Sequence, residues 1–352
     1  MPTTQVNSKF RQVINKRTAL LMVRFLIICF VLGFCLGSLL IIIAVEPASQ
    51  NPNVEEQLIT IVPGMSGRDV TQLLYEQQLI KRPNLFHGLL RLTKADQRLK
   101  AGEYLLSASM RPLQIIGRLN AGNIVTHKVM IPEGYQIKEI AALLAEAGFV
   151  DENRFLTLAY NATLVYGDQP PLDLPIESLE GYLFPDTYRF AKGQSEESII
   201  KHMVDRFITV VTPVIEPYLD QTDLTLHEVV TLASIVEKEV VVDEERPIVA
   251  GVYLNRLRIN MPLQADPTVR YVMTENRSRV LYRDLEIDSP YNTYMYNKLP
   301  PGPIASPGLS SILAVLEPAD VDYLYFVARG DGTHQFSKTY NEHLQARKEL
   351  GY

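Results

Sequence analysis

The chain has 352 residues, enough for two or three domains, and its formal net charge is −6 at neutral pH. Hydrophobic residues make up 47% of it and charged residues 21%, a balance that excludes a disordered chain. The acidic charge also argues against nucleic acid and against an anionic lipid surface as the main partner.

A transmembrane helix is predicted over residues 19–45, after a basic cytoplasmic tail at 1–18. Residues 25–45, FLIICFVLGFCLGSLLIIIAV, are uncharged and long enough as a helix to span a hydrocarbon core of roughly 30 Å. A cleaved signal peptide and a core helix are the alternatives. Every charge before Glu46 is positive, which predicts a single-pass protein of the cell inner membrane with a cytoplasmic N-terminus. Residues 46–352, with the catalytic domain, are then expected in the periplasm.

Residues 46–56 are polar and read as a linker, and a compact module is predicted over residues 57–122. The alternating residues 57–62 indicate a strand, and Ser66 is a suitable N-cap for a helix that continues to about residue 80. A second helix over 84–93 and a strand over 101–109 complete a strand–helix–helix–strand (βααβ) order.

Part of this module is repeated. Residues 59–80 align without a gap to residues 129–150, and Gly64 matches Gly134 in the turn between strand and helix. Each glycine is expected to supply a backbone angle that a side chain resists. Residues 123–160 are therefore interpreted as a partial repeat at the start of a domain covering 123–352. The alternative is that strand–turn–helix units simply resemble one another.

The sequence pattern over the rest of the chain predicts a mixed α+β domain. Helices are expected over 195–217, 225–241, 248–259 and 339–349, with an interruption at Arg246-Pro247. Residues 262–308 form a proline-rich loop region, and Asp331-Gly332 marks the turn of a hairpin over 322–337.

Two glutamates near the end of the helix at 225–241 are not equivalent. Glu239 continues the apolar stripe of Leu232, Ile235 and Val236, whereas Glu237 points about 200° away around the helix. Glu237 is therefore expected to face solvent or a partner chain. A carboxyl group on a buried face has a raised pKa and can act as a general acid, for example toward a glycosidic oxygen. The alternative is a structural Glu239 that pairs with Arg246.

A hydrolase would need a second carboxylate, whereas a lytic reaction needs one group only. The spacing does not exclude five candidates for the second: Asp186, Asp243, Glu244, Glu245 and Asp266. Metal and thiol chemistry have little support. The histidines lack close metal-ligand spacing, and both cysteines, Cys29 and Cys35, lie in the predicted membrane segment.

Several motifs together resemble the YceG-like (MltG) endolytic murein transglycosylases. They are LEGYLFPDTY at 179–188, LASIVEKE at 232–239, VYLNRLRINMPLQADPTVRY at 252–271, SPYNTYMYNKLPPGPIASPG at 289–308 and YLYFVARGDGTHQFS at 323–337. The resemblance covers about residues 46–350. It implies an N-terminal anchor, a LysM-like module, and a catalytic domain whose lysozyme-like helix carries the catalytic glutamate. That residue would be Glu239, with Ile235 four positions before it, and no metal or cofactor is implied.

Further substrate-binding candidates follow from the same motifs. Asp266 resembles a motif residue near the cleft, although before Pro267 it would also suit a turn. The YNTY segment could stack on and hydrogen-bond sugar rings, with loop packing as the alternative. Glu180 is a candidate for a second carboxylate facing the cleft, although exposure on the surface is the more ordinary outcome. The full set is Glu180, Glu237, Gln264, Asp266, Thr268, Tyr291, Asn292, Thr293 and Tyr294.

The sequence thus predicts an endolytic lytic transglycosylase that cuts nascent peptidoglycan strands between N-acetylmuramic acid and N-acetylglucosamine. It would leave 1,6-anhydro-N-acetylmuramic acid ends and so terminate glycan elongation during cell wall assembly. Peptidoglycan synthases are expected partners by resemblance to the family. The rival hypotheses are a non-catalytic, peptidoglycan-binding membrane tether and a muramidase-type hydrolase.

Overall fold

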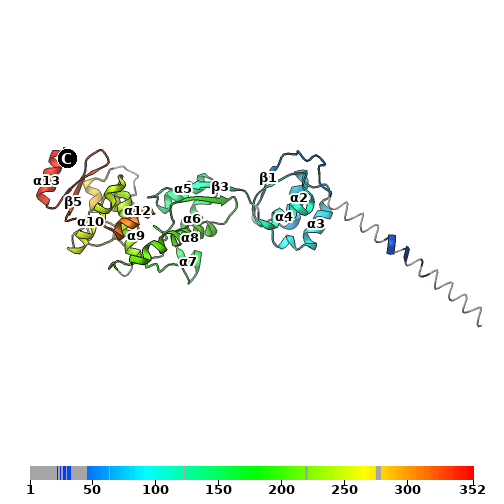
Figure 1. Ribbon diagram of the computed structural model, residues 1–352, viewed down its shortest axis with the longest axis horizontal. Helices are drawn as coiled ribbons and strands as arrows, with labels where there is room; N and C mark the ends of the chain where they lie inside the picture. The colour runs from blue at the N-terminus through cyan, green and yellow to red at the C-terminus, as the bar shows by residue number, and fades with distance from the viewer. Residues whose placement is uncertain are drawn as a thin grey trace, which may run out of the picture. The chain divides into compact units, whose positions relative to one another are not determined.

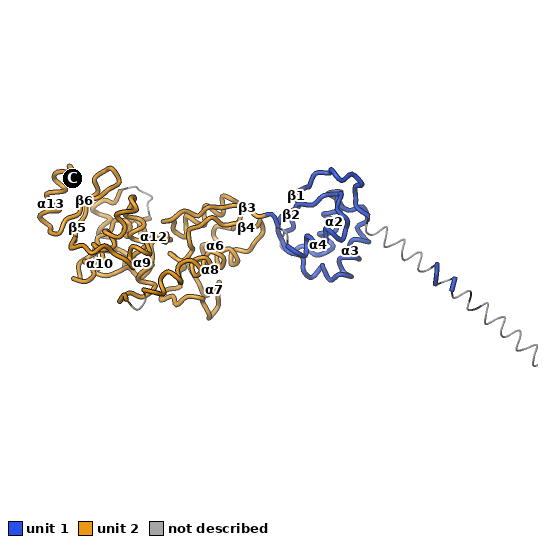
Figure 2. Tube along the Cα trace, in the orientation of Figure 1, with its two compact units in different colours: residues 1–125 blue, residues 126–352 orange. Residues whose placement is uncertain are grey.

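The computed structural model describes residues 46–352 apart from 63, 123, 219–220 and 275–278, together with positions 22, 24, 27, 28 and 30–32. The predicted tail and most of the predicted transmembrane helix lie outside these residues. Among the residues described, no helix is long and apolar enough to cross a membrane. The chain divides into two compact units, residues 1–125 and 126–352 (Figures 1 and 2).

The first unit has the predicted strand–helix–helix–strand order followed by one more helix. It contains β1 (Gln57–Ile61), α2 (Gly67–Glu76), α3 (Pro83–Leu92), η1 (Ala95–Gln97), β2 (Gly102–Leu106) and α4 (Pro112–Ala121). Strands β1 and β2 pair antiparallel, with Ile59 opposite Tyr104. Ser66 caps α2 as expected, in a capping box with Asp69. The unit has its own hydrophobic core, which includes the fully buried Leu74, Leu90 and Tyr104.

The second unit begins with a similar arrangement. Its first elements are β3 (Thr126–Met130), α5 (Ile137–Glu146), α6 (Glu152–Ala159), α7 (Ala162–Tyr166), β4 (Thr187–Ala191), α8 (Glu196–Ile215) and η2 (Glu216–Tyr218). Strands β3 and β4 pair antiparallel, as β1 and β2 do, and helices follow the first strand in both cases. Gly64 and Gly134 have φ angles of 88° and 74°. The shared turn therefore uses the left-handed backbone that was expected of its glycine.

The remaining elements follow helix α9 (Leu226–Glu239) in the chain. They are η3 (Asp243–Glu245), α10 (Arg246–Arg258), α11 (Asp266–Val272), η4 (Tyr282–Glu286), α12 (Leu309–Leu316), β5 (Tyr325–Ala328), β6 (His334–Ser337) and α13 (Tyr340–Glu349). Helix α9 contacts α10, α11 and α12, and α13 packs on the β5–β6 hairpin (Figure 1). The mixed α+β class is confirmed.

Helix α9 is buried on all sides over residues 229–236, as expected of a helix in the middle of a core. Thr225 begins the helix with a capping box to Glu228, and the chain turns extended at Val240. The last turn is therefore where polar side chains reach the edge of the core. Glu237 and Glu239 both lie in that turn.

Gly181 lets the segment after Glu180 pack closely against Pro303 of the proline-rich loop. Its φ angle is +86°, and a Cβ there would lie 2.4 Å from Cβ of Pro303. Backbone conformation and close packing thus both require glycine at this position.

We expect Gly181→Ala to lower the free energy of unfolding by roughly 3 kcal/mol, because left-handed strain and a steric clash add. Urea denaturation followed by circular dichroism measures the loss. Gly330→Ala is the matched control, since Gly330 has φ +85° but nothing within 4 Å of its Cβ position. It should cost only about 1 kcal/mol, and equal losses in both variants would show that the contact with Pro303 is unimportant.

Candidate active site

A cleft of about 700 Å³ opens at the C-terminal end of α9. Glu239 lines it together with Gln264, Asp266 and Tyr294, all from the proline-rich region or the start of α11. Arg256 of α10 and residues of β5, α13 and the 279–285 segment complete the lining. The structure thus brings together four of the sequence-predicted site residues.

Glu239 is the last residue of α9 and is partly buried. Burial and the nearby charge of Asp266 raise the pKa of its carboxyl group to about 7, while Arg270 and Arg256 oppose the shift. Within the part of the chain that the structure describes, no hydrogen bond or ion pair engages this carboxyl group. Arg246, its suggested structural partner, pairs with Glu237 and Asp243 instead.

Asp266 is the one candidate second carboxylate found in the lining of this cleft. The hydroxyl of Tyr294 donates a 2.7 Å hydrogen bond to its Oδ1. The other candidates lie elsewhere: Asp186 pairs with Arg206, Asp243 with Arg246 and Glu245 with His334, and Glu244 is an exposed residue of η3. Glu239 and Asp266 are therefore the two acids that can act on one bound molecule.

A buried pair of threonines holds the segment that carries Gln264 and Asp266. Gln264 has a left-handed φ of 47°, and its backbone N–H donates to the carbonyl oxygen of Thr293 at 3.0 Å. The hydroxyl groups of Thr268 and Thr293 lie 2.9 Å apart, and Thr293 Oγ1 also accepts from the backbone of Ala265. These buried hydrogen bonds hold the backbone of Gln264 in its strained, left-handed conformation.

Three residues predicted to bind substrate are buried instead. Asn292 and Thr268 are 0% exposed and Thr293 is 1% exposed, so they support the cleft without reaching it. The side-chain amide of Asn292 donates to the carbonyl oxygens of Leu285 and Ile287. Residue type alone did not distinguish these buried polar residues from cleft residues, because their hydrogen bonds form only when the loops fold.

Tyr291 and Glu180 also lie away from the cleft lining. Tyr291 packs against Tyr271, with ring centroids 4.9 Å apart. Glu180, expected to be exposed, is 0% exposed and accepts hydrogen bonds from the backbone N–H of Ile137 and the hydroxyl of Tyr271. Its burial raises the pKa of its carboxyl group to about 8. This arrangement joins the start of α5 to α11.

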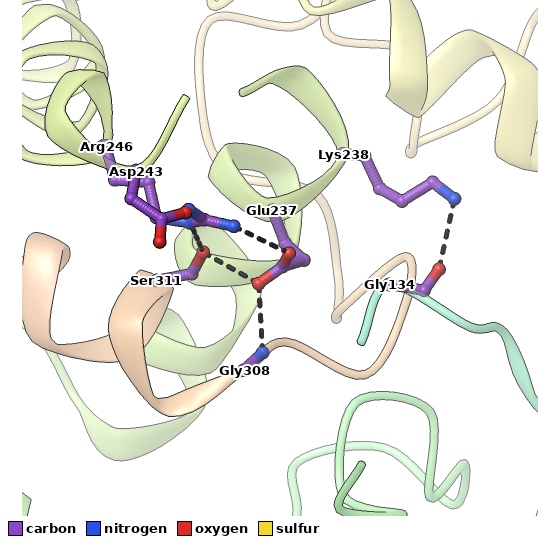
Figure 3. A network of polar contacts seen from close by, with 7 residues as sticks. All are labelled: Gly134, Glu237, Lys238, Asp243, Arg246, Gly308 and Ser311. Atoms are coloured by element: carbon purple, nitrogen blue, oxygen red, sulfur yellow. Dashed lines mark hydrogen bonds and ion pairs between the residues drawn. The ribbon is translucent and has the colours of Figure 1, made fainter. Parts of the chain in front are cut away.

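Glu237 does not face solvent, contrary to the helix-angle prediction (Figure 3). Its side chain is 7% exposed and pairs with Arg246 at 3.2 Å. Its other oxygen accepts from the Gly308 N–H at 3.0 Å and from the Ser311 hydroxyl at 2.8 Å. The prediction was wrong because α12, whose N-cap is Gly308, covers this face of α9.

The neighbouring Lys238 fastens the same turn to another part of the unit. Its ammonium group donates to the carbonyl oxygen of Gly134 at 3.0 Å (Figure 3). The Gly134 N–H in turn donates to the carbonyl oxygen of Ser306 at 2.8 Å. Glu237 and Lys238 therefore hold the end of α9 from two sides, and Glu239 extends from that fixed turn.

Some cleft residues were missed by the sequence analysis: Arg256, Tyr325, His343 and Arg347. Tyr325 lies in a motif that resembles the family. In contrast, no pattern in the sequence links His343 and Arg347 of α13 to Glu239. In the described residues, no group of three or more His, Cys, Asp or Glu side chains could hold a metal ion.

Comparisons with known proteins identify the family of this chain. The YceG-like family model matches residues 59–349, so the chain belongs to that family. The endolytic murein transglycosylase of Bacillus subtilis is 35% identical over 306 residues, with 83% of this chain and 84% of that protein covered. The enzyme of the same name from Streptococcus pneumoniae serotype 2 is 31% identical over 304 residues, covering 77% of this chain and 54% of the relative. This chain therefore spans about half of that longer relative.

A solved structure extends the likeness to the fold. The 2.6 Å crystal structure of a yceG-like protein from Listeria monocytogenes matches with a TM-score of 0.58 and 36% sequence identity. The match covers 84% of this chain and 100% of that one. The fold and the family assignment therefore agree.

We expect Glu237→Gln to lower the free energy of unfolding by roughly 3 kcal/mol, since it leaves the buried Arg246 without its buried counter-ion. Urea denaturation measures this cost. Asp243→Asn is the control, because Asp243 binds the same arginine with a side chain that is 79% exposed. It should cost less than about 1 kcal/mol. The reverse ranking would mean that Asp243, and not Glu237, neutralises Arg246.

Proposed function

We propose that this chain is an endolytic murein transglycosylase and that Glu239 is its catalytic acid and base. One observation carries the assignment of the residue. Glu239 combines a position in a cleft, a pKa of about 7 and the lack of a cation paired with it among the described residues. A group with these properties holds a proton near neutral pH and can release it to a bound substrate.

In the proposed reaction the carboxyl group of Glu239 donates its proton to the glycosidic oxygen that joins N-acetylmuramic acid to N-acetylglucosamine. The bond from C1 of the muramic acid to that oxygen breaks, and N-acetylglucosamine leaves with a free 4-hydroxyl. The Glu239 carboxylate then removes the proton of the muramic acid 6-hydroxyl, whose oxygen bonds to C1. A 1,6-anhydro end results, and Glu239 recovers its proton without consuming water.

Asp266 would act electrostatically in this scheme. Its negative charge raises the pKa of Glu239, which favours the protonated acid at the start of the reaction. The same charge would stabilise the oxocarbenium-like transition state as the glycosidic bond breaks. Tyr294 supports this role by holding the Asp266 carboxylate with a hydrogen bond.

The cellular setting forms part of the proposal. Residues 19–45 would anchor the chain in the inner membrane with residues 1–18 in the cytoplasm, supported by the apolar run and the positive charges before Glu46. The catalytic domain would then act in the periplasm on nascent strands, with peptidoglycan synthases as partners. Residues 57–122 would form a LysM-like module, in keeping with the βααβ order of the first unit.

Glu239→Gln should reduce cleavage of uncrosslinked glycan by at least about 100-fold, because the amide cannot exchange the proton that the reaction moves. Mass spectrometry of the products provides the measurement. Wild-type protein should give 1,6-anhydro ends, and Glu244→Gln, which removes an exposed carboxyl group outside the cleft, should retain them. Reducing muramic acid ends would identify a hydrolase, and unchanged strands with wild-type protein would favour a non-catalytic tether.

The same variant has a stability signature. The pKa of Glu239 rises from 4.5 to about 7 on folding, so the folded state binds more protons and wild-type stability should fall as pH rises across that range. Glu239→Gln should remove this fall and be more stable than wild type at pH 8, by on the order of 1–3 kcal/mol. Urea denaturation at pH 5 and pH 8 compares the two. If the variant were no more stable than the wild type at pH 8, the pKa of the Glu239 carboxyl group would not be raised by folding.

Asp266→Asn should shift the pH profile. Removing the negative charge lowers the pKa of Glu239, so activity should be lost at a lower pH than in the wild type as pH rises. The profile of kcat/KM against pH measures the shift. Asp186→Asn, which removes an acid outside the cleft, should leave the alkaline limb in place. If the Asp266→Asn enzyme were slower but the alkaline limb of its pH profile stayed in place, Asp266 would serve only to hold the loop.

A further inference from the structure

The cleft has a positively charged side as well as an acidic one. Arg256 of α10 and Arg347 of α13 line the same cleft as Glu239 and Asp266. Neither arginine takes part in the reaction proposed above. Their placement raises the question of which part of a substrate would need them.

Arg256 is fixed in place but not neutralised by an ion pair. It is 6% exposed, and its guanidinium group donates to the carbonyl oxygens of Leu324 and Leu263, each at 2.6 Å. It also lies 5.4 Å from the ring centroid of Tyr325. No carboxylate of a described residue lies within ion-pair distance of it, so a positive charge stays inside the cleft wall.

Arg347 carries a second charge into the cleft and has a free guanidinium group. It lies in the last turn of α13 and is exposed, and across the described ranges no acid or carbonyl accepts a hydrogen bond from its side chain. His343 precedes it by four residues, which places both on one face of the helix. The ring of His343 stacks on Tyr325 with centroids 5.4 Å apart. Arg256, Tyr325, His343 and Arg347 therefore form one continuous surface, which we call the basic wall.

His343 does not add a charge to the basic wall. Burial and the nearby positive charges of Arg347 and Arg256 lower the pKa of its imidazole, so the ring is neutral near pH 7. It serves as a flat spacer between Tyr325 and the free guanidinium of Arg347. Tyr340 flanks it, with ring centroids 6.4 Å apart. The wall thus offers aromatic faces next to a planar, bidentate cation.

A free guanidinium beside aromatic rings is suited to a carboxylate on an extended chain. The glycan backbone of peptidoglycan offers hydroxyl and acetamido groups, and its lactyl carboxyl is joined by an amide bond to the stem peptide. Free carboxylates occur along the stem peptide itself. We propose that the basic wall binds a stem-peptide carboxylate through Arg347, so that the enzyme selects strands whose peptides keep their negative charge. This inference rests on the proposed function.

The test uses two substrates that differ in charge alone. Uncrosslinked strands with free stem-peptide carboxylates are compared with the same strands after carbodiimide-mediated amidation of those carboxylates by ammonia. For the wild-type chain, amidation should lower kcat/KM roughly five- to tenfold. For Arg347→Gln, kcat/KM on free-acid strands should fall by a similar factor, and the ratio between the two substrates should fall to about one.

Two further variants make the result specific. Lys348→Gln removes the same charge from the next residue of α13, which is exposed and outside the cleft lining, and should keep the wild-type ratio. Arg347→Lys keeps the charge without the planar fork and should give an intermediate ratio. Equal losses for Arg347→Gln on both substrates, or a wild-type enzyme indifferent to amidation, would overturn the proposal. If the wild type still produced anhydro ends in either of those two outcomes, the proposed function would stand. If the wild type cleaved neither substrate, the proposed function itself would be contradicted.

Discussion

The carboxyl group of Glu239 has to be kept from cations and yet remain open to a substrate. Burial raises its pKa, Asp266 raises it further, and the negative end of the α9 dipole acts in the same direction. An arginine in contact with Glu239 would reverse this effect. The structure avoids that outcome by pairing Arg246, the arginine nearest to Glu239 in the sequence, with Glu237. Two glutamates in one helical turn thus have opposite environments.

This division of roles depends on segments far apart in the sequence. Glu237 binds Gly308 and Ser311 at the start of α12, and Lys238 binds Gly134 in the turn between β3 and α5 (Figure 3). These contacts restrain the end of α9 without touching the cleft. Because Glu239 is joined to this fixed turn, its direction is set by the backbone and not by a hydrogen-bond partner. The carboxyl group can then keep its proton and still be positioned.

The part of this arrangement that follows from helix periodicity could be predicted from the sequence. The stripe of Leu232, Ile235 and Val236 placed Glu239 on the buried face, and the capping residues and turn glycines located most helices and strands. Periodicity treats the other face as solvent, and for that reason it misplaced Glu237. Glu180 was expected to be exposed for a different reason: its partners Ile137 and Tyr271 lie on other elements, which the local sequence does not show. Short polar residues such as Thr268 and Thr293 look alike in sequence whether they line a cleft or support it.

The basic wall shows a different limit of sequence reasoning. Arg256 of α10 and Arg347 of α13 are far apart in the sequence, and only packing of α13 on the β5–β6 hairpin brings Arg347 to the cleft that Arg256 lines. The consequence is a cleft with separate chemical regions. Glu239 and Asp266 form a region suited to proton transfer, in which Arg256 only partly opposes the raised pKa of Glu239, while both arginines lower the pKa of His343. Had a free guanidinium contacted Glu239 directly, the pKa of the acid would fall and the proton would be lost. Keeping charge recognition apart from acid catalysis lets one cleft hold both.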